Sequence, residues 1–129
     1  MAWVQLVTLL AGVQFLWLGL LVARARMRYG VVAPATAGNE MFERYHRVHM
    51  NTLETLVVFL PALWIAAQYW SPRWMAALGA IYLVGRMLYL QGYVADPKGR
   101  HIGYAVTVLP VIALILIGLY GAIGTLLLR

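Results

Sequence analysis

Cysteine is absent from the 129 residues of this chain, and only 11% of the residues are charged. Without cysteine the protein has no disulfide, no thiolate metal site and no cysteine nucleophile, so any thiol chemistry has to use a thiol supplied by a substrate. Histidine is scarce as well. His46 and His49 lie three residues apart without a convincing third ligand, and His101 is far away in sequence. We therefore expect no metal site.

The shortage of charge is matched by an excess of apolar residues. The chain is 64% hydrophobic, whereas soluble domains are about 45–50% apolar and about 25% charged. Together with a mean hydropathy of +0.80, this composition predicts an integral membrane protein. The length fits one domain over residues 1–129. No Lys or Arg precedes Arg24, which argues against a signal peptide.

Four segments are long and apolar enough to be membrane helices, each of which needs about 20 residues to cross a bilayer. We predict these helices at residues 2–28, 40–69, 72–95 and 100–128. Their continuous apolar runs exclude the alternating strands of a membrane β-barrel. The predicted fold class is therefore all-α, an integral membrane four-helix bundle.

Three glycines lie close together near the end of the last predicted helix, at positions 118, 121 and 124. They form a thin helix surface, and small residues allow helices to approach closely in membranes. A bundle of four helices is slender, so we expect such a surface to favour oligomerisation.

The distribution of basic residues predicts the orientation in the membrane. Eight of the ten Lys and Arg side chains belong to one side, and two belong to the other. The eight are Arg24, Arg26, Arg28, Arg44, Arg47, Arg86, Lys98 and Arg100, and the two are Arg73 and Arg129. The positive-inside rule then places the first side in the cytoplasm and both termini outside. Because topology explains the net charge of +6, we expect no nucleic-acid partner.

The second predicted helix begins with a line of polar side chains. Arg47, Asn51 and Glu54 are spaced i, i+4 and i+7, which puts them within about 60° of one helix face and along about 10 Å of its axis. Charged residues that enter a membrane segment are costly and indicate a functional site. Two signs of charge and an amide favour a zwitterionic ligand.

The third predicted helix carries Arg86, Tyr89 and Tyr93 on one face. Arg86 lies about ten residues from the helix end, too deep for easy contact with water, so it needs a buried partner. Glu54 lies at a similar depth, and one interpretation is an ion pair that only holds the bundle together. The other interpretation is that Glu54 binds the ligand. The two tyrosines suit an interfacial aromatic belt as well as a ligand site.

Arg26 and Arg100 lie at the ends of apolar segments. Their positions alone favour a role in membrane topology. Together with Arg47, however, they leave surplus positive charge at one level of the bundle. This surplus favours an anionic ligand, because guanidinium groups bind carboxylates through two parallel hydrogen bonds.

Two motifs resemble a known family. The sequence ERYHRVHMNTLE at residues 43–54 resembles the signature of the membrane-associated proteins in eicosanoid and glutathione metabolism, the MAPEG family. The sequence VGRMLYLQGY at residues 84–93 is similar to the third helix of the branch that contains microsomal glutathione transferase 3 and leukotriene C4 synthase. The resemblance covers nearly the whole chain, whose end soon after the fourth helix resembles compact bacterial members.

The resemblance implies a homotrimer of four-helix subunits that bind glutathione between neighbours near the cytoplasmic face. Arg100 matches the arginine that stabilises the glutathione thiolate, and it is the implied catalytic residue. Tyr89 and Tyr93 would reach the ligand from the neighbour's third helix, and Arg26 would bind a carboxylate. The predicted glutathione-binding residues are Arg26, Arg47, His49, Asn51, Glu54, Arg86, Tyr89 and Tyr93.

Four departures from the family's eicosanoid enzymes bear on the reaction. Thr55 stands where some of them have Tyr, and Pro61 comes later than their Pro. Met27 stands where leukotriene C4 synthase has a second arginine, and Thr52 stands where prostaglandin synthases have Asp. We therefore expect a general detoxifying glutathione transferase that attacks lipophilic electrophiles, or a glutathione-dependent peroxidase that reduces lipid hydroperoxides.

The expected location is a bacterial inner membrane, where membrane lipid surrounds the trimer. Two alternatives remain open. One is a non-catalytic, lipid-binding MAPEG member. The other is a small four-helix transporter, although the first predicted helix has none of the acidic residues that such proton-coupled exporters use.

Overall fold

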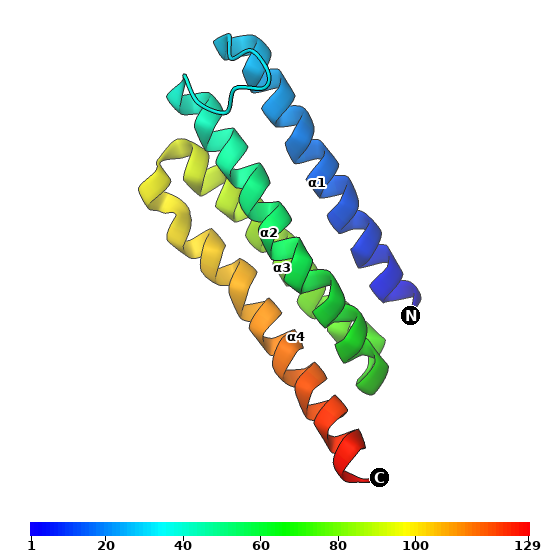
Figure 1. Ribbon diagram of the computed structural model, residues 1–129. Coiled ribbons are helices and arrows are strands. Elements are labelled where there is room, and N and C mark those ends of the chain that lie inside the picture. Colours follow the sequence, from blue (N-terminus) through cyan, green and yellow to red (C-terminus); the bar gives the residue numbers. More distant parts are fainter.

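Four long helices make up almost all of the computed structural model, which describes residues 1–129 (Figure 1). The elements are α1 at Ala2–Tyr29, α2 at Glu40–Tyr69, α3 at Pro72–Ala95, a short 3-10 helix η1 at Pro97–Arg100, and α4 at His101–Leu127. There is no strand, so the all-α prediction is confirmed. The fourth helix differs slightly from its expected start, because residues 97–100 form the 3-10 turn before the α-helix begins.

Local sequence signals explain where the helices begin and end. Gly30 ends α1 in the left-handed conformation, with φ of 70°, which glycine adopts without steric cost. The Asn39 side chain accepts a hydrogen bond of 3.0 Å from the Phe42 amide and so caps the start of α2. Pro72 begins α3, where its missing N–H costs nothing. These signals leave ten residues between α1 and α2 and two between α2 and α3.

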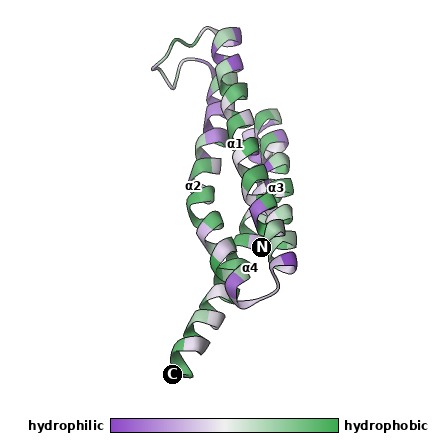
Figure 2. Cartoon of the chain, turned by 90° about the vertical axis from the view of Figure 1, so that its right-hand side faces the viewer, coloured by the Kyte–Doolittle hydropathy of each residue, from purple (hydrophilic) through white to green (hydrophobic).

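The two outer helices flank a central pair. α1 packs against α2 and α3, and α4 packs against the same two helices from the other side. The α1–α2 loop and the η1 turn lie at one end of the bundle, which we call the loop end (Figure 1). Both chain termini lie toward the opposite end. The part of α2 nearest the loop end is largely hydrophilic, as Figure 2 shows in purple.

Three helical segments are long and apolar enough to cross a membrane: α1, α2 and Pro97–Leu127. We predicted a fourth, but α3 is not among them. Its 24 residues include Arg73, Arg86 and Gln91, which lower its mean hydropathy. The three apolar segments and the composition make the chain an integral membrane protein.

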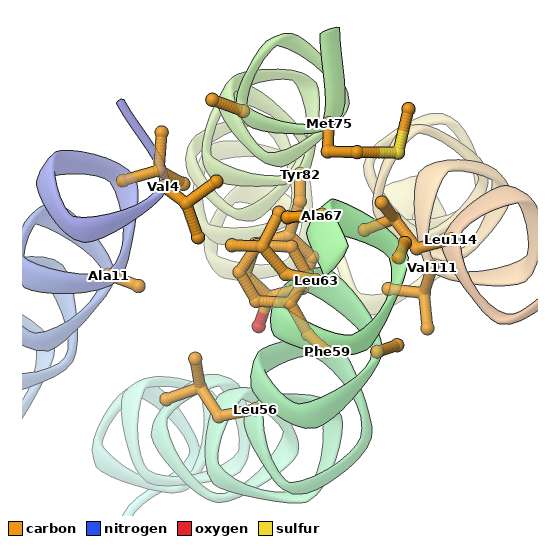
Figure 3. Packing of buried hydrophobic residues seen from close by; sticks show 14 residues of the cluster. Val4, Ala11, Leu56, Phe59, Leu63, Ala67, Met75, Tyr82, Val111 and Leu114 are labelled. Atoms are coloured by element: carbon orange, nitrogen blue, oxygen red, sulfur yellow. The ribbon is translucent and has the colours of Figure 1, made fainter. Parts of the chain in front are cut away.

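The largest hydrophobic cluster lies in the half of the bundle away from the loop end (Figure 3). All four helices contribute fully buried side chains to it, including Val4, Phe59, Leu63, Tyr82 and Leu114. The Phe59 and Tyr82 rings stack with their centroids 3.8 Å apart. This apolar layer fixes the spacing of the helices in the half of the bundle that carries few polar groups.

α3 and α4 make the closest helix contact in the bundle, through glycines. A Cβ atom added to Gly85 would lie 2.6 Å from the Thr107 backbone nitrogen. A Cβ atom on Gly103 would overlap the backbone of Tyr89. The two backbones therefore touch at both points, as small residues allow in membrane bundles. This contact fixes the position of the middle of α3 relative to the start of α4.

The three glycines near the end of α4 do not form one free surface. A Cβ atom on Gly118 would meet Ile65 at 3.3 Å, and one on Gly121 would overlap the Tyr69 ring. Gly124 alone has nothing within 4 Å. The predicted thin surface is thus occupied largely by α2 of the same chain, because the end of α4 crosses close to the end of α2.

Candidate functional site

A polar pocket opens near the loop end between α2, α3 and the start of α4. Its volume is about 340 Å³. We call it the arginine pocket, and it is lined by Arg47, Asn51, Tyr89, Tyr93, Arg100, His101 and Tyr104. Five of these seven residues are among those that the sequence predicted for a ligand site. The structure brings those five together within one chain.

Helix periodicity places each wall of the arginine pocket. Arg47 and Asn51 are one turn apart on α2, as are Tyr89 and Tyr93 on α3. The two tyrosine rings stack with their centroids 5.6 Å apart. Arg100 ends η1, and its Nη1 atom donates a hydrogen bond of 2.9 Å to the carbonyl oxygen of Pro97. The tight turn thus returns the chain to the pocket and directs a second guanidinium toward it.

The arginine pocket has an uncompensated positive charge. Its lining contains the guanidinium groups of Arg47 and Arg100 and no carboxylate. The one ion pair in the structure joins Arg44 to Glu40, with Nη2 2.6 Å from Oε1, so neither arginine of the pocket is neutralised by a side chain. Both are exposed. A pocket with this lining is suited to an anion that offers carboxylate oxygens.

Arg86 lies beneath the arginine pocket and is only 1% exposed. Its Nε atom donates to Thr107 Oγ1 at 3.1 Å, and its Nη1 atom donates to Asn51 Oδ1 at 2.7 Å and to Thr52 Oγ1 at 3.3 Å. The guanidinium carbon lies 4.4 Å from the centre of the Tyr89 ring. Neutral oxygen atoms from two neighbouring helices therefore surround the buried cation.

Of the two interpretations of Glu54, the ion pair with Arg86 is not found in the structure. Glu54 is exposed on the outer face of α2 and forms no ion pair. Thr52, which does contact Arg86, lies two positions earlier and so about 160° around the helix. The buried arginine is satisfied by hydroxyl and amide groups instead of a carboxylate, and this leaves Glu54 free for another role.

Comparison with known proteins places the chain in a family. A model of the MAPEG family matches residues 4–120, which include every residue of the arginine pocket. The chain belongs to the MAPEG family. The resemblance carried by the two sequence motifs is thereby confirmed.

Several curated proteins are similar to this MAPEG member. Microsomal glutathione S-transferase 2 of Homo sapiens is 36% identical over 118 residues, which are 92% of this chain and 78% of the human protein. Leukotriene C4 synthase of Cavia porcellus is 37% identical over 94 residues, 73% of this chain and 63% of that enzyme. An uncharacterised protein of Synechocystis sp. is 50% identical over 103 residues, 80% of this chain and 75% of that protein.

Two predicted site residues of this MAPEG chain lie outside the arginine pocket, toward α1. The Arg26 Nη1 atom donates a hydrogen bond of 2.6 Å to the carbonyl oxygen of Ala35, and its guanidinium lies 4.7 Å from the centre of the Phe42 ring. The His49 ring stacks on Phe15, with the centroids 4.5 Å apart. Within one chain, neither side chain contributes to the pocket that contains Arg47 and Arg100.

The tyrosines of α3 line a pocket of their own chain. Tyr89 and Tyr93 share this lining with Arg47 and Asn51, so one chain can offer them to a ligand together. The prediction that they reach the ligand from a neighbouring subunit concerns the assembled protein and stays a prediction.

Sequence reasoning missed the contribution of α4 to this MAPEG site. His101 and Tyr104 line the arginine pocket, but only Arg100 was identified near the start of the fourth helix. Tyr104 follows Arg100 by four residues, so one turn of helix puts the two on the same face. That spacing was visible in the sequence and could have pointed to Tyr104.

Sequence reasoning also missed Arg44, which joins α2 to the end of α3. Its Nη1 atom donates to the Val94 carbonyl oxygen at 2.9 Å and to that of Ala95 at 3.3 Å, while Nη2 bonds Glu40. The last carbonyl groups of a helix lack partners within the helix. Arg44 supplies donors to them and holds the end of α3 beside the arginine pocket.

Proposed function

We propose that this MAPEG chain is a membrane glutathione transferase that binds glutathione in the arginine pocket and activates it as a thiolate. The observation that carries the proposal is the pair of unneutralised guanidinium groups, Arg47 and Arg100, in a pocket without a carboxylate. Glutathione has two carboxylates and one thiol, and the chain has no cysteine of its own. The relatives named glutathione S-transferase and leukotriene C4 synthase support this assignment.

In the proposed mechanism the pocket residues have distinct roles. Arg47 and Asn51 bind polar groups of glutathione from α2, and Tyr89 and Tyr93 contact it from α3. Arg100 lies at the mouth and holds the sulfur as a thiolate. A free thiol has a pKa of about 8.5, and a nearby guanidinium favours the charged form. The thiolate then forms a bond to a lipophilic electrophile, and the electron pair moves onto that electrophile or its leaving group.

The proposed assembly is a homotrimer with its sites near subunit boundaries. His49 and Glu54 belong to the family motif and Arg26 matches a family arginine at the end of the first helix, but none of the three lines the arginine pocket of its own chain. Glu54 is exposed on α2, while Arg26 and His49 lie beside α1. In the proposed trimer a neighbouring chain would supply such residues to a glutathione site at the subunit boundary.

The proposed location is a bacterial inner membrane, with the arginine pocket facing the cytoplasm. The α1–α2 loop and η1 lie at the loop end (Figure 1). Arg100 of η1 lines the pocket, and most basic residues flank these connections. The positive-inside rule assigns that end to the cytoplasm, where glutathione is supplied. Lipophilic substrates enter from the surrounding lipid.

Purified protein in detergent or nanodiscs tests the proposal. Calorimetry should show glutathione binding, and turnover should appear with at least one of an aromatic halide, an activated alkene or a lipid hydroperoxide. Binding without turnover would identify a non-catalytic member instead. No binding at all would overturn the proposal, and proton-driven export by reconstituted protein would favour the transporter.

Replacement of Arg100 tests the role in thiolate formation. Arg100→Ala should lower the thiolate fraction at neutral pH and slow conjugation by about tenfold, with little loss of glutathione affinity. Ultraviolet absorbance of bound thiolate, titrated with pH, measures this directly. Arg73→Ala removes an exposed arginine at the far end of the bundle and serves as the control. An unchanged thiol pKa in Arg100→Ala would exclude the assigned role.

A further inference from the structure

Arg86 has an environment that its expected role in ligand contact does not explain. It is only 1% exposed and is absent from the lining of the arginine pocket. No carboxylate pairs with it. A buried guanidinium is costly in a membrane protein and marks a functional element. Its contacts with two pocket residues, Asn51 and Tyr89, indicate that Arg86 serves the arginine pocket.

The first contact fixes the Asn51 side-chain amide. Arg86 Nη1 donates a hydrogen bond of 2.7 Å to Asn51 Oδ1. Because an asparagine amide has an acceptor oxygen on one side and two N–H donors on the other, this bond keeps the donors away from the guanidinium. A flipped amide would set N–H donors against N–H donors. Asn51 lines the arginine pocket, so its donors remain available there.

The second contact supports the Tyr89 ring. The guanidinium carbon of Arg86 lies 4.4 Å from the ring centre, a distance at which a cation is attracted to an aromatic face. Tyr89 itself stacks on Tyr93, and both rings line the pocket. Arg86 thus contacts two parts of the pocket lining from below: the Tyr89 ring on α3 and the Asn51 amide on α2.

Two threonines hold the guanidinium in this position. Thr107 on α4 accepts from Nε, and Thr52 on α2 accepts from Nη1. The fork geometry of arginine allows bonds to several helices at once, which the ammonium of a lysine cannot reproduce. Its Nη2 atom is buried without a hydrogen-bond partner, so the protein satisfies only part of the donor fork.

We propose that Arg86 is a positioning residue for glutathione binding, which holds the Asn51 amide with its N–H donors toward the ligand and supports Tyr89. The inference rests on the proposed function. Arg86 does not touch glutathione, and its effect on affinity passes through Asn51. Arg86 is therefore a buried residue that affects ligand binding through Asn51, without contact with the ligand itself.

A double-mutant cycle tests this dependence on Asn51. Glutathione affinity is measured by calorimetry for the unsubstituted protein, Arg86→Lys, Asn51→Ala and the double variant. Each single change should weaken binding by about tenfold, and the double variant should bind no more weakly than Asn51→Ala, because residues of one hydrogen-bond network are coupled. Additive losses would overturn the inference while leaving the proposed function intact. Failure of the unsubstituted protein to bind glutathione would overturn both.

Two further variants separate positioning from general support of the fold. Thr8→Val removes the acceptor of the Trp64 indole N–H, a bond that involves neither Arg86 nor the pocket lining, so it should lower the melting temperature and leave glutathione affinity unchanged. A loss of affinity in proportion to stability would indicate a merely structural role for Arg86. Asn51→Asp keeps the acceptor for Arg86 and removes the N–H donors, so it should fold even where Arg86→Lys does not. Undiminished glutathione affinity in Asn51→Asp would overturn the inference.

Discussion

Leu63 in the apolar half of the bundle and Arg86 near the loop end are buried equally well but by different means. In the apolar half, Leu63 is 0% exposed and is held by packing alone, while near the loop end Arg86 is 1% exposed and is held by hydrogen bonds. Packing tolerates modest changes of shape, whereas hydrogen bonds require fixed partners. The arginine pocket lies above the hydrogen-bonded half. The hydrogen bonds of Arg86 leave this layer less freedom to rearrange than the apolar core has. Such a layer suits a pocket whose Asn51 donors have to keep one orientation.

The strongest test of this comparison is a substitution where the two backbones touch. Gly103→Val should destabilise the bundle by more than about 3 kcal/mol, because overpacking displaces backbone as well as side chains. The added atoms would overlap the Tyr89 backbone. Size-exclusion chromatography and thermal unfolding in detergent measure the effect. Gly124→Val, at a position with nothing within 4 Å, is the matched control in the same helix. Equal stability of the two variants would contradict the observed α3–α4 contact.

A cavity in the apolar half should affect stability and leave the site alone. Leu63→Ala removes a fully buried side chain and should cost about 2–4 kcal/mol through lost packing contacts. Glutathione affinity, measured well below the melting temperature, should not change. Leu116→Ala, which removes a side chain that is 61% exposed, controls for loss of leucine itself. A large loss of affinity in Leu63→Ala would show that the two halves are not independent.

The reverse pattern is expected for an arginine that lines the pocket. Arg47→Ala should weaken glutathione binding by roughly tenfold or more, since it removes a charge-assisted hydrogen bond. The melting temperature without ligand should stay the same, because Arg47 is exposed and forms no ion pair. Lys98→Ala, an exposed cation near the same end, controls for net charge. If both variants lose affinity equally, the pocket acts only through its overall charge.

The smallest effect is expected at the surface ion pair of α2. Glu40→Gln removes the partner of Arg44, and Glu40 is 80% exposed, so the stability change should stay below about 1 kcal/mol. Arg44→Gln should cost more, because it also removes the donors to the Val94 and Ala95 carbonyl oxygens. Thermal unfolding of both variants ranks them. The opposite ranking would mean that the ion pair, and not the contact to α3, is what stabilises the loop end.

Sequence reasoning predicted the helices because long apolar runs and turn residues such as Gly30 and Pro72 are local signals. It also predicted Arg47, Asn51, Tyr89, Tyr93 and Arg100, the five that line one pocket. Each belongs to a motif or flanks a helix end. These features depend on neighbours in sequence, which the chain itself displays.

Contacts between helices could not be predicted in the same way. The choice of partner for Arg86 depends on how α2 and α4 are rotated toward α3. Opposite charge at equal depth favoured Glu54, but the rotation of α2 directs Thr52 toward Arg86 instead. Likewise, the number of residues between Gly103 and Tyr89 gives no sign that their backbones touch. Such rotations follow from the packing of whole helices.

The polar character of α3 has a consequence for how the protein is made. A segment with a central arginine enters a bilayer reluctantly on its own, at a cost of about 2.5–3.5 kcal/mol for that residue. α2 is synthesised before α3 and supplies Asn51 and Thr52 as hydrogen-bond acceptors for Arg86. These acceptors favour release of α3 from the translocation machinery together with α2. We therefore expect cooperative insertion of these two helices, in which Asn51 and Thr52 of the first offset part of the cost of Arg86 in the next.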